Sequence, residues 1–294
     1  MRQSYANLLL LLAAAVWGLA FVFQKTAMEH IGPYLFLAAR SFIAALVLLP
    51  LALRENRVLG TQPLPHFWII SALGGISFFV GGILQQIGLV TATVTNTGFL
   101  TGLYVVVTPL LMWVLFQRMP QFYVWPAIIL AFCGTWLLGG GTLSGFSYGD
   151  WLVAVSAIFW AAHILVTEQS GRHVRPIGFT ATQFFIVALL STIGAVAFET
   201  ISFTALAGAV FEIAYVGILS SALTFTLLAI ALKYTPPAEA SILVSMETVF
   251  AALCAFVMLG ERLSPLGWSG AAVMFSATLI VHIAPTVFIA KTKK

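Results

Sequence analysis

Two ionisable residues, Arg40 and Glu247, stand inside long apolar runs of the sequence. An ionisable side chain inside a membrane costs several kcal/mol unless it is paired or faces water. Glu247 lies near the middle of its run, where it would bind a cationic group of a ligand or a proton. Alternatively, it is protonated and hydrogen-bonded to a neighbouring helix. Arg40 lies about 10 Å into its run at about 1.5 Å per residue, where its guanidinium would hold a carboxylate. Alternatively, Arg40 bonds helix-end carbonyls or an internal acid.

Aromatic and polar residues in other apolar runs are further candidates for a binding site. Trp17, Phe21 and Trp160 would form an apolar lining, although packing between helices explains these residues equally well. His163 follows Trp160 on the same helical face, where it would relay a proton or pack as a neutral, hydrogen-bonded side chain. Asn96 begins an apolar run and would either line an outer gate or cap a helix.

The sequence repeats itself at a constant offset of 143 positions. The pairs of identical residues at this offset include Trp17 and Trp160, Pro33 and Pro176, Phe36 and Phe179, Leu100 and Leu243, and Trp125 and Trp268. The same offset joins Glu247 to Tyr104 and Arg40 to Gln183, so polar residues stand at both positions of each pair. Tyr104 and Gln183 therefore join the predicted binding site, which would lie between two homologous halves of the chain.

Each half contains apolar sequence for five helices that cross a membrane, since about 20 apolar residues span roughly 30 Å of hydrocarbon. The two halves are residues 1–143 and 144–294. The ten helices are predicted over residues 6–24, 33–53, 67–89, 95–116, 121–139, 150–169, 176–198, 208–232, 237–259 and 264–286. Because five is odd, the second half would begin on the opposite side of the membrane. The predicted fold is an all-α membrane protein in which two inverted five-helix repeats surround a central cavity.

The composition indicates that lipid is the solvent for most of the surface. Only 7% of the residues are charged, 61% are hydrophobic and the mean hydropathy is +1.05, whereas soluble domains carry about 25% charged residues. The formal net charge of +4 does not indicate nucleic-acid binding, because Lys and Arg of membrane proteins collect in cytoplasmic loops.

If the N-terminus is cytoplasmic, most basic residues outside the helices lie on the cytoplasmic side: Arg2, Arg54, Arg57, Arg118, Arg172, Arg175, Lys233, Lys291, Lys293 and Lys294. Only Lys25 and Arg262 then fall outside, so both termini are predicted to be cytoplasmic.

Three segments resemble the drug/metabolite transporter superfamily, in its EamA branch. They are residues 17–21 (WGLAF), 98–110 (GFLTGLYVVVTPL) and 239–263, which ends in Gly-Glu-Arg-Leu. Thr248 stands where the family usually has a proline, and residues 117–120 (QRMP) replace the Gly-Glu-Arg-Leu turn in the first half. The resemblance covers essentially the whole chain. It implies ten helices around a central cavity and transport of small metabolites, often amino acid export, across the bacterial inner membrane.

We therefore expect a secondary transporter that exports a small metabolite, such as an amino acid or a related compound, by alternating access. Arg40 would bind the carboxylate of that substrate, Glu247 its amine, and the aromatic residues its side chain. A channel or facilitator for small solutes is the alternative. An intramembrane enzyme is less well supported, because the sequence has no HExxH, no Gly-x-Ser-x-Gly and a single Asp. Beyond substrate and lipid, protons are a candidate coupling ion, and no cofactor, metal or nucleic acid is expected.

Overall fold

The computed structural model describes residues 1–61, 63–141, 146–171 and 174–292, and the side chains of these residues up to 284. Every regular element in these ranges is helical. The elements are α1 (Gln3–Ala27), α2 (Pro33–Leu59), α3 (Pro65–Thr91), α4 (Val94–Thr101), α5 (Tyr104–Phe116), α6 (Val124–Leu138), α7 (Tyr148–Ser170), α8 (Pro176–Phe198), α9 (Phe203–Gly208), α10 (Val210–Tyr215), the π-helix η2 (Val216–Leu223), α11 (Thr224–Ala231), α12 (Pro237–Val244), α13 (Glu247–Leu259) and α14 (Pro265–Thr292).

The predicted ten-helix, all-α membrane fold is confirmed. In the described residues, nine helical segments are long and apolar enough to cross a membrane, and α6 is a shorter apolar helix of 15 residues. Three of the nine are composite, namely α4 with α5, α10 with η2 and α11, and α12 with α13. Proline supplies the first residue of five helices, α2, α3, α8, α12 and α14. A proline at this position costs no hydrogen bond, because the first amide of a helix has no partner within the helix.

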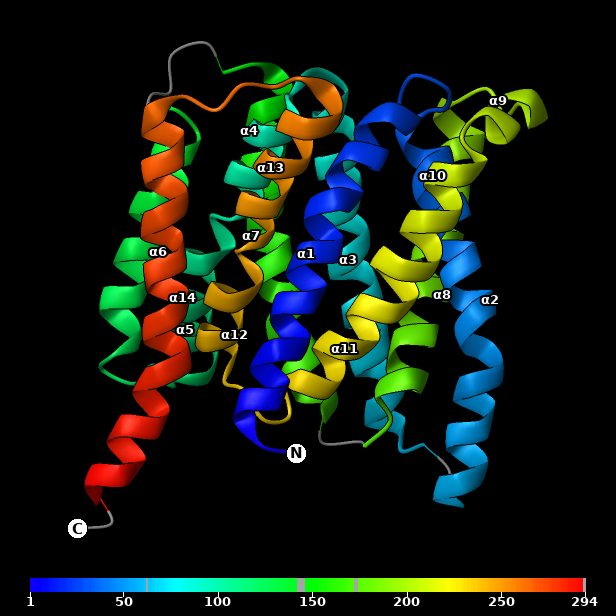
Figure 1. Cartoon of the computed structure of the whole chain (residues 1–294). Coiled ribbons are helices and arrows are strands. Elements are labelled where there is room, and N and C mark those ends of the chain that lie inside the picture. Colours follow the sequence, from blue (N-terminus) through cyan, green and yellow to red (C-terminus); the bar gives the residue numbers. More distant parts are fainter. Residues whose placement is uncertain (62, 142–145, 172–173, 293–294) are drawn as a thin grey trace.

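The helices pack as one bundle, in which α1 and α3 lie between α6 and α14 on one side and α2 and α8 on the other (Figure 1). Helix α2 packs against α8, and α6 packs against α14. Each of these pairs joins positions 143 residues apart, as a two-fold relation between the predicted repeats would require. The same offset relates the break between α4 and α5 to the break between α12 and α13. The composite helices cross near these breaks, because α4 contacts α13 and α5 contacts α12.

Helix α1 begins and α14 ends at the lower edge of Figure 1. We call this the terminal side of the bundle, and the opposite edge the far side. Of the basic residues that were assigned to the cytoplasm, Arg172, Lys293 and Lys294 lie outside the described residues, as does the side chain of Lys291. The others stand at the ends of elements on the terminal side, whereas Lys25 and Arg262 stand on the far side.

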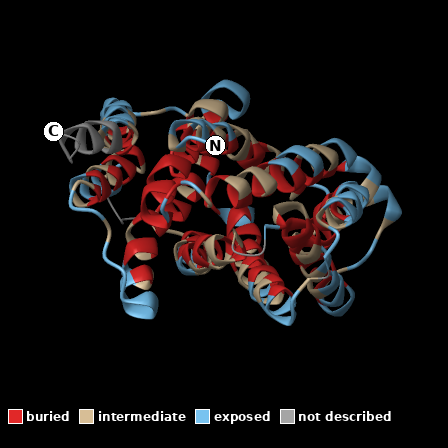
Figure 2. Ribbon diagram, turned by 90° about the horizontal axis from the view of Figure 1, so that it is seen from below, coloured by how far each residue is buried: buried red, intermediate tan, exposed pale blue. Residues whose placement is uncertain are grey.

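Apolar side chains cover the outside of the bundle. Buried residues occupy the faces where helices meet, and exposed residues face outward (Figure 2). Many of the exposed side chains are large and hydrophobic, for example Leu46, Ile129, Phe185, Ile193 and Val196. Such a surface suits hydrocarbon rather than water, as the low charge content predicted.

Candidate functional site

A cavity of about 50 Å³ lies at the centre of the bundle, beside the breaks in the two crossing composite helices. Seven of the nine predicted site residues line it: Trp17, Phe21, Arg40, Tyr104, Trp160, His163 and Glu247. One water needs roughly 10–15 Å³ of such space, so the cavity holds only a few waters in this conformation. The structure therefore brings most of the predicted residues to one small, shared space.

Glu247 and Tyr104, which stand 143 positions apart in the sequence, contact each other directly. The Tyr104 hydroxyl donates a hydrogen bond to Glu247 Oε1 over 2.9 Å. Each residue is the first of its half-helix, α13 and α5 respectively, and both side chains are buried, with Glu247 5% exposed. No basic group lies within 4.0 Å of Glu247 in the described part of the chain, so its carboxyl group has only a neutral partner.

Arg40, on α2, is buried in the same cavity without a carboxylate partner. It is 3% exposed, and its Nη1 donates to Gln24 Oε1 over a long 3.4 Å. Its Cζ lies 5.7 Å from the ring centroids of Phe36 and Phe78, a distance at which aromatic faces attract a cation. The Arg40 Nε is buried with no hydrogen-bond partner, and no acid lies within 4.0 Å among the described residues. The pairing with an internal acid that we considered is therefore not found there.

Aromatic rings form one wall of the cavity. Phe225 lies 4.8 Å from Trp17 and 4.9 Å from Phe78, measured between ring centroids, and Phe78 lies 5.0 Å from Trp160. The two tryptophans occupy equivalent positions but differ in bonding. Trp17 Nε1 donates to the backbone oxygen of Ser220 over 2.9 Å, within the π-helix η2, where the wider turn alters the regular backbone pairing. Trp160 Nε1 is buried and has no partner among the described residues.

The cavity is polar toward the far side and apolar toward the terminal side. Gln24, Gln85 and Thr101 line its far half with Arg40, and Gln85 Nε2 donates to Thr101 Oγ1 over 2.7 Å. The positions equivalent to Gln85 and Thr101 in the second half are Leu228 and Val244, which line the terminal half together with Ile164. Equivalent positions thus supply a polar end and an apolar end to one cavity.

Two predicted site residues do not line the cavity. Gln183 lies behind His163, whose Nε2 is 2.8 Å from Gln183 Oε1. Asn96 lies near the far-side end of α4, where its amide donates to Asp150 Oδ1 over 3.3 Å and the helix is capped by Thr93 instead. Their roles in binding stay predictions.

Several lining residues were absent from the predicted site, namely Gln24, Phe78, Gln85, Thr101 and Phe225. Gln24 follows Phe21 by three positions on α1, so the shared helical face was a usable signal. The others are neutral residues in runs that contain many similar ones, and nothing local distinguishes a cavity-lining phenylalanine from a core phenylalanine.

A second cavity, of about 360 Å³, opens on the terminal side beside the turn between α11 and α12. Its lining includes both signs of charge: Arg118, Glu168, Lys233 and Glu239. Arg118 Nη1 lies 3.5 Å from Glu168 Oε1. Burial, reinforced by its hydrogen bond to the Glu239 carboxylate, raises the pKa of Tyr123 well above its ordinary value. Burial lowers the pKa of Lys233, and the negative charge of the Glu55 carboxylate partly opposes this lowering.

Comparison with known proteins finds similarity along the whole chain. The profile of the EamA-like transporter family matches twice, over residues 4–140 and 147–283. An uncharacterized transporter of Archaeoglobus fulgidus is 31% identical over 282 residues, which are 96% of this chain and 87% of that protein. The threonine/homoserine exporter RhtA of Escherichia coli K12 is 30% identical over 214 residues, or 70% of this chain and 66% of that exporter. A crystal structure aligned over 100% of both chains has a TM-score of 0.78 at 18% sequence identity, a likeness of fold alone.

Proposed function

Because the chain belongs to the EamA-like transporter family, we propose that it is a secondary transporter that exports an amino acid or a closely related zwitterion by alternating access. The terminal side would face the cytoplasm of a bacterial cell, as the bias of Lys and Arg toward that side indicates. The name of the relative RhtA, a threonine/homoserine exporter, supports both the substrate class and the direction.

One observation carries this proposal: a buried cation and a buried acid line one cavity, and neither has an oppositely charged partner. Arg40 and Glu247 are 3% and 5% exposed, and neither forms an ion pair within the described residues. An uncompensated buried charge is costly. A zwitterion supplies both missing partners at once, with its carboxylate on Arg40 and its ammonium group on Glu247. The rings of Trp17, Trp160 and Phe225 would then take an apolar side chain.

The size of the central cavity supports alternating access. Space for only a few waters is little for a substrate, so binding would require the two halves to move apart on one side. Three apolar residues, Ile164, Leu228 and Val244, line its end toward the larger cavity on the terminal side. This arrangement suits a carrier that opens to one side at a time.

Proton coupling is part of the proposal. A protonated Glu247 would keep its hydrogen bond with Tyr104 and leave no buried negative charge when the substrate is absent. Arrival of the ammonium group would favour release of that proton, so the substrate and a proton would compete for one carboxyl group.

Counterflow in proteoliposomes tests the transport mechanism. Vesicles are loaded with unlabelled amino acid, and uptake of the labelled compound is followed with and without that load. A carrier shows faster uptake into loaded vesicles and saturates with substrate. Uptake that neither saturates nor responds to the load would favour the channel alternative, and chemical conversion of the label would indicate an enzyme. Variants Glu29→Gln and Arg54→Lys, both at exposed positions, serve as controls that should transport normally.

A further inference from the structure

On the far side, two charged side chains hold the turn between α3 and α4. Lys25, at the end of α1, donates to three backbone oxygens at the end of α3: Leu89 at 2.9 Å, Val90 at 3.0 Å and Ala92 at 3.0 Å. A cation at a helix C-terminus and an anion at a helix N-terminus are both favoured by the helix dipole.

Glu261, just beyond α13, holds the other end of the same turn. Its carboxylate accepts from the backbone amides of Val94 and Thr95 over 3.0 Å and 3.1 Å, and from Thr95 Oγ1 over 2.6 Å. The first turn of α4 is therefore fixed to the end of α13, and the end of α3 is fixed to α1. These contacts close the far side of the bundle.

The equivalent residues on the terminal side carry the opposite charges. The repeat offset places Glu168 at the position of Lys25, and Arg118 at the position of Glu261. The equivalent turn, between α11 and α12, contains Pro236 and Pro237 where the far side has Thr93 and Val94. Proline has no amide hydrogen. Pro237 thus lacks the amide that Val94 offers to Glu261. In addition, the Glu168 carboxylate cannot donate to backbone oxygens as Lys25 does, and the Arg118 guanidinium cannot accept from backbone amides as Glu261 does. The far-side clamp therefore has no counterpart here, and side-chain pairs are left to hold this turn.

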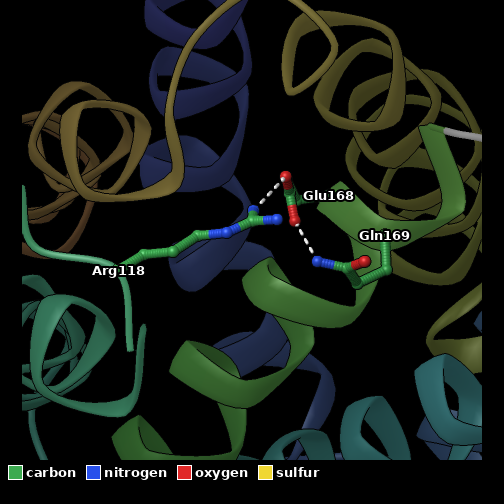
Figure 3. A network of polar contacts seen from close by, with 3 residues as sticks. All are labelled: Arg118, Glu168 and Gln169. Atoms are coloured by element: carbon green, nitrogen blue, oxygen red, sulfur yellow. Dashed lines mark hydrogen bonds and ion pairs between the residues drawn. The ribbon is translucent and has the colours of Figure 1, made fainter. Parts of the chain in front are cut away.

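In this structure the two residues bind each other instead of the turn. Arg118 Nη1 lies 3.5 Å from Glu168 Oε1, and the Gln169 amide donates to Glu168 Oε2 over 2.5 Å (Figure 3). The cavity of about 360 Å³ lies between this pair and the turn. It is one helical turn from the central cavity, because Glu168 follows Ile164 and Leu232 follows Leu228 by four residues. The terminal side is therefore open at the place where the far side is closed.

The turn itself supplies a suitable partner for each member of the pair. Lys233 forms no ion pair in the described ranges. Its side chain passes the end of α7, because a Cβ built on Gly171 would lie 3.2 Å from Lys233 Cγ. Gly171 follows Glu168 by three residues, which is about one helical turn. Burial disfavours the charged form of Lys233 and lowers its pKa, so a closer carboxylate would stabilise the ammonium group. Glu239, in the first turn of α12, lines the same cavity as Arg118 and is held by Gln3 and Tyr123, which are neutral.

We propose that Arg118 and Glu168 form the terminal-side gate and exchange partners when it closes, so that Glu168 binds Lys233 and Arg118 binds Glu239. The two gates would thus use equivalent positions with opposite charges. On the far side the charged side chains bind backbone groups, and on the terminal side they bind other charged side chains. The inference rests on the proposed alternating access, but it requires no particular substrate.

Thiol accessibility tests the exchange without substrate. Met112 lines the terminal cavity and is 7% exposed, so a cysteine there reacts with a membrane-impermeant maleimide chiefly when the gate is open. The background replaces the free cysteines Cys133 and Cys254 by alanine. A cysteine at Met119, which is 59% exposed, controls for reagent access and should react at one rate in every variant.

The decisive comparison is the effect of Lys233→Glu in two backgrounds. With Glu168 present, Lys233→Glu opposes closure, so the alkylation rate should stay the same or rise. With Glu168→Lys present, the same change restores a closing pair, and alkylation should become about two- to fivefold slower, the range expected for a partly exposed ion pair. The milder Lys233→Gln should not slow alkylation with Glu168 present.

The proposal is overturned if Lys233→Glu changes the rate by the same factor in both backgrounds, since Glu168 and Lys233 would then never interact. Size-exclusion profiles establish that each variant is folded. The proposed substrate is tested separately by counterflow. If amino acids show no counterflow while the effect of Lys233→Glu on the alkylation rate still depends on the residue at position 168, the proposed substrate is refuted and the proposed gate is retained.

Discussion

The hydrogen bond between Tyr104 and Glu247 joins two positions that the sequence repeat relates, and it is one of the contacts between the two halves of the chain at the site. The two side chains differ in charge although their backbones are equivalent. A strictly symmetric site would suit a symmetric ligand. Tyr104 opposite Glu247, and Gln183 at the position equivalent to Arg40, make the site asymmetric, as a ligand with one positive and one negative end requires.

Glu247→Gln tests the carboxylate. The amide can still bond to Tyr104, so the fold should be preserved, but it cannot compensate an ammonium group. We expect transport affinity to fall by about 30-fold or more, since losing one member of a buried charge pair costs about 2 kcal/mol or more. Concentration dependence of counterflow gives the value. Unchanged kinetics in this variant, beside normal Glu29→Gln, would remove Glu247 from the site.

Arg40→Lys tests the guanidinium. Lysine keeps the charge but loses the planar fork that matches a carboxylate. We expect amino acids to lose about tenfold or more in affinity, while their amides, which lack the carboxylate, change little. Competition of both compounds against labelled substrate provides the measurement. A variant that is less heat-stable in detergent but keeps its selectivity would show that Arg40 is structural.

At the scale of elements, close contact between α1 and α13 explains a glycine of the first apolar run. A Cβ built on Gly18 would lie 2.7 Å from the Ala251 backbone nitrogen and would also collide with Phe250 Cβ. Backbone on the facing helix cannot move aside as a side-chain tip can. Gly82, on α3, is a matched control, because its Cβ would lie at an ordinary 3.5 Å from Leu37 and Phe78.

Gly18→Ala should therefore destabilise the protein by about 1–3 kcal/mol, the usual cost of overpacking. Gly82→Ala should be neutral or slightly stabilising, because alanine favours helix more than glycine does. Thermal unfolding in detergent compares the two. Equal stabilities of both variants would mean that α1 and α13 can separate freely at this contact.

The elements also show how far the sequence could predict the fold. The predicted helices 176–198 and 237–259 have the bounds observed, because Pro176 and Pro237 fix where they begin. The helix predicted over residues 121–139 is shorter, Val124–Leu138. The π-helix η2 was not predicted. One of its backbone oxygens, that of Ser220, accepts a hydrogen bond from Trp17 on a helix distant in the sequence, and no local pattern encodes that contact.

The same limit applies to the site. Arg40 and Glu247 could be recognised because a charge in an apolar run is costly wherever the run packs. Phe78 and Phe225 could not, because their neighbours in the sequence are equally apolar. Glu261 lies 166 residues from Thr95, whose amide it binds, and only the three-dimensional fold brings them together.

At the scale of the whole molecule, the two copies of the repeat have similar backbones, and the residues that differ between them make the two sides of the bundle different. On the far side Lys25 and Glu261 hold the turn between α3 and α4, whereas on the terminal side a cavity opens beside Arg118 and Glu168. In the proposed mechanism, two copies in opposite orientation would exchange these arrangements by a small relative movement. A substrate that binds both halves would couple that movement to its own passage.

The most direct test of this account is the heat stability of the purified protein with amino acids and with two derivatives of the best one, its amide and its N-acetyl form. A ligand that binds only the folded state stabilises it by about 2.7 kcal/mol at 100 times its Kd. We predict that the zwitterion raises the unfolding temperature and that each derivative at the same concentration raises it much less, because each lacks the charge that Arg40 or Glu247 would bind. Equal stabilisation by the zwitterion and both derivatives, or none by any amino acid, would contradict a site built on two unpaired charges.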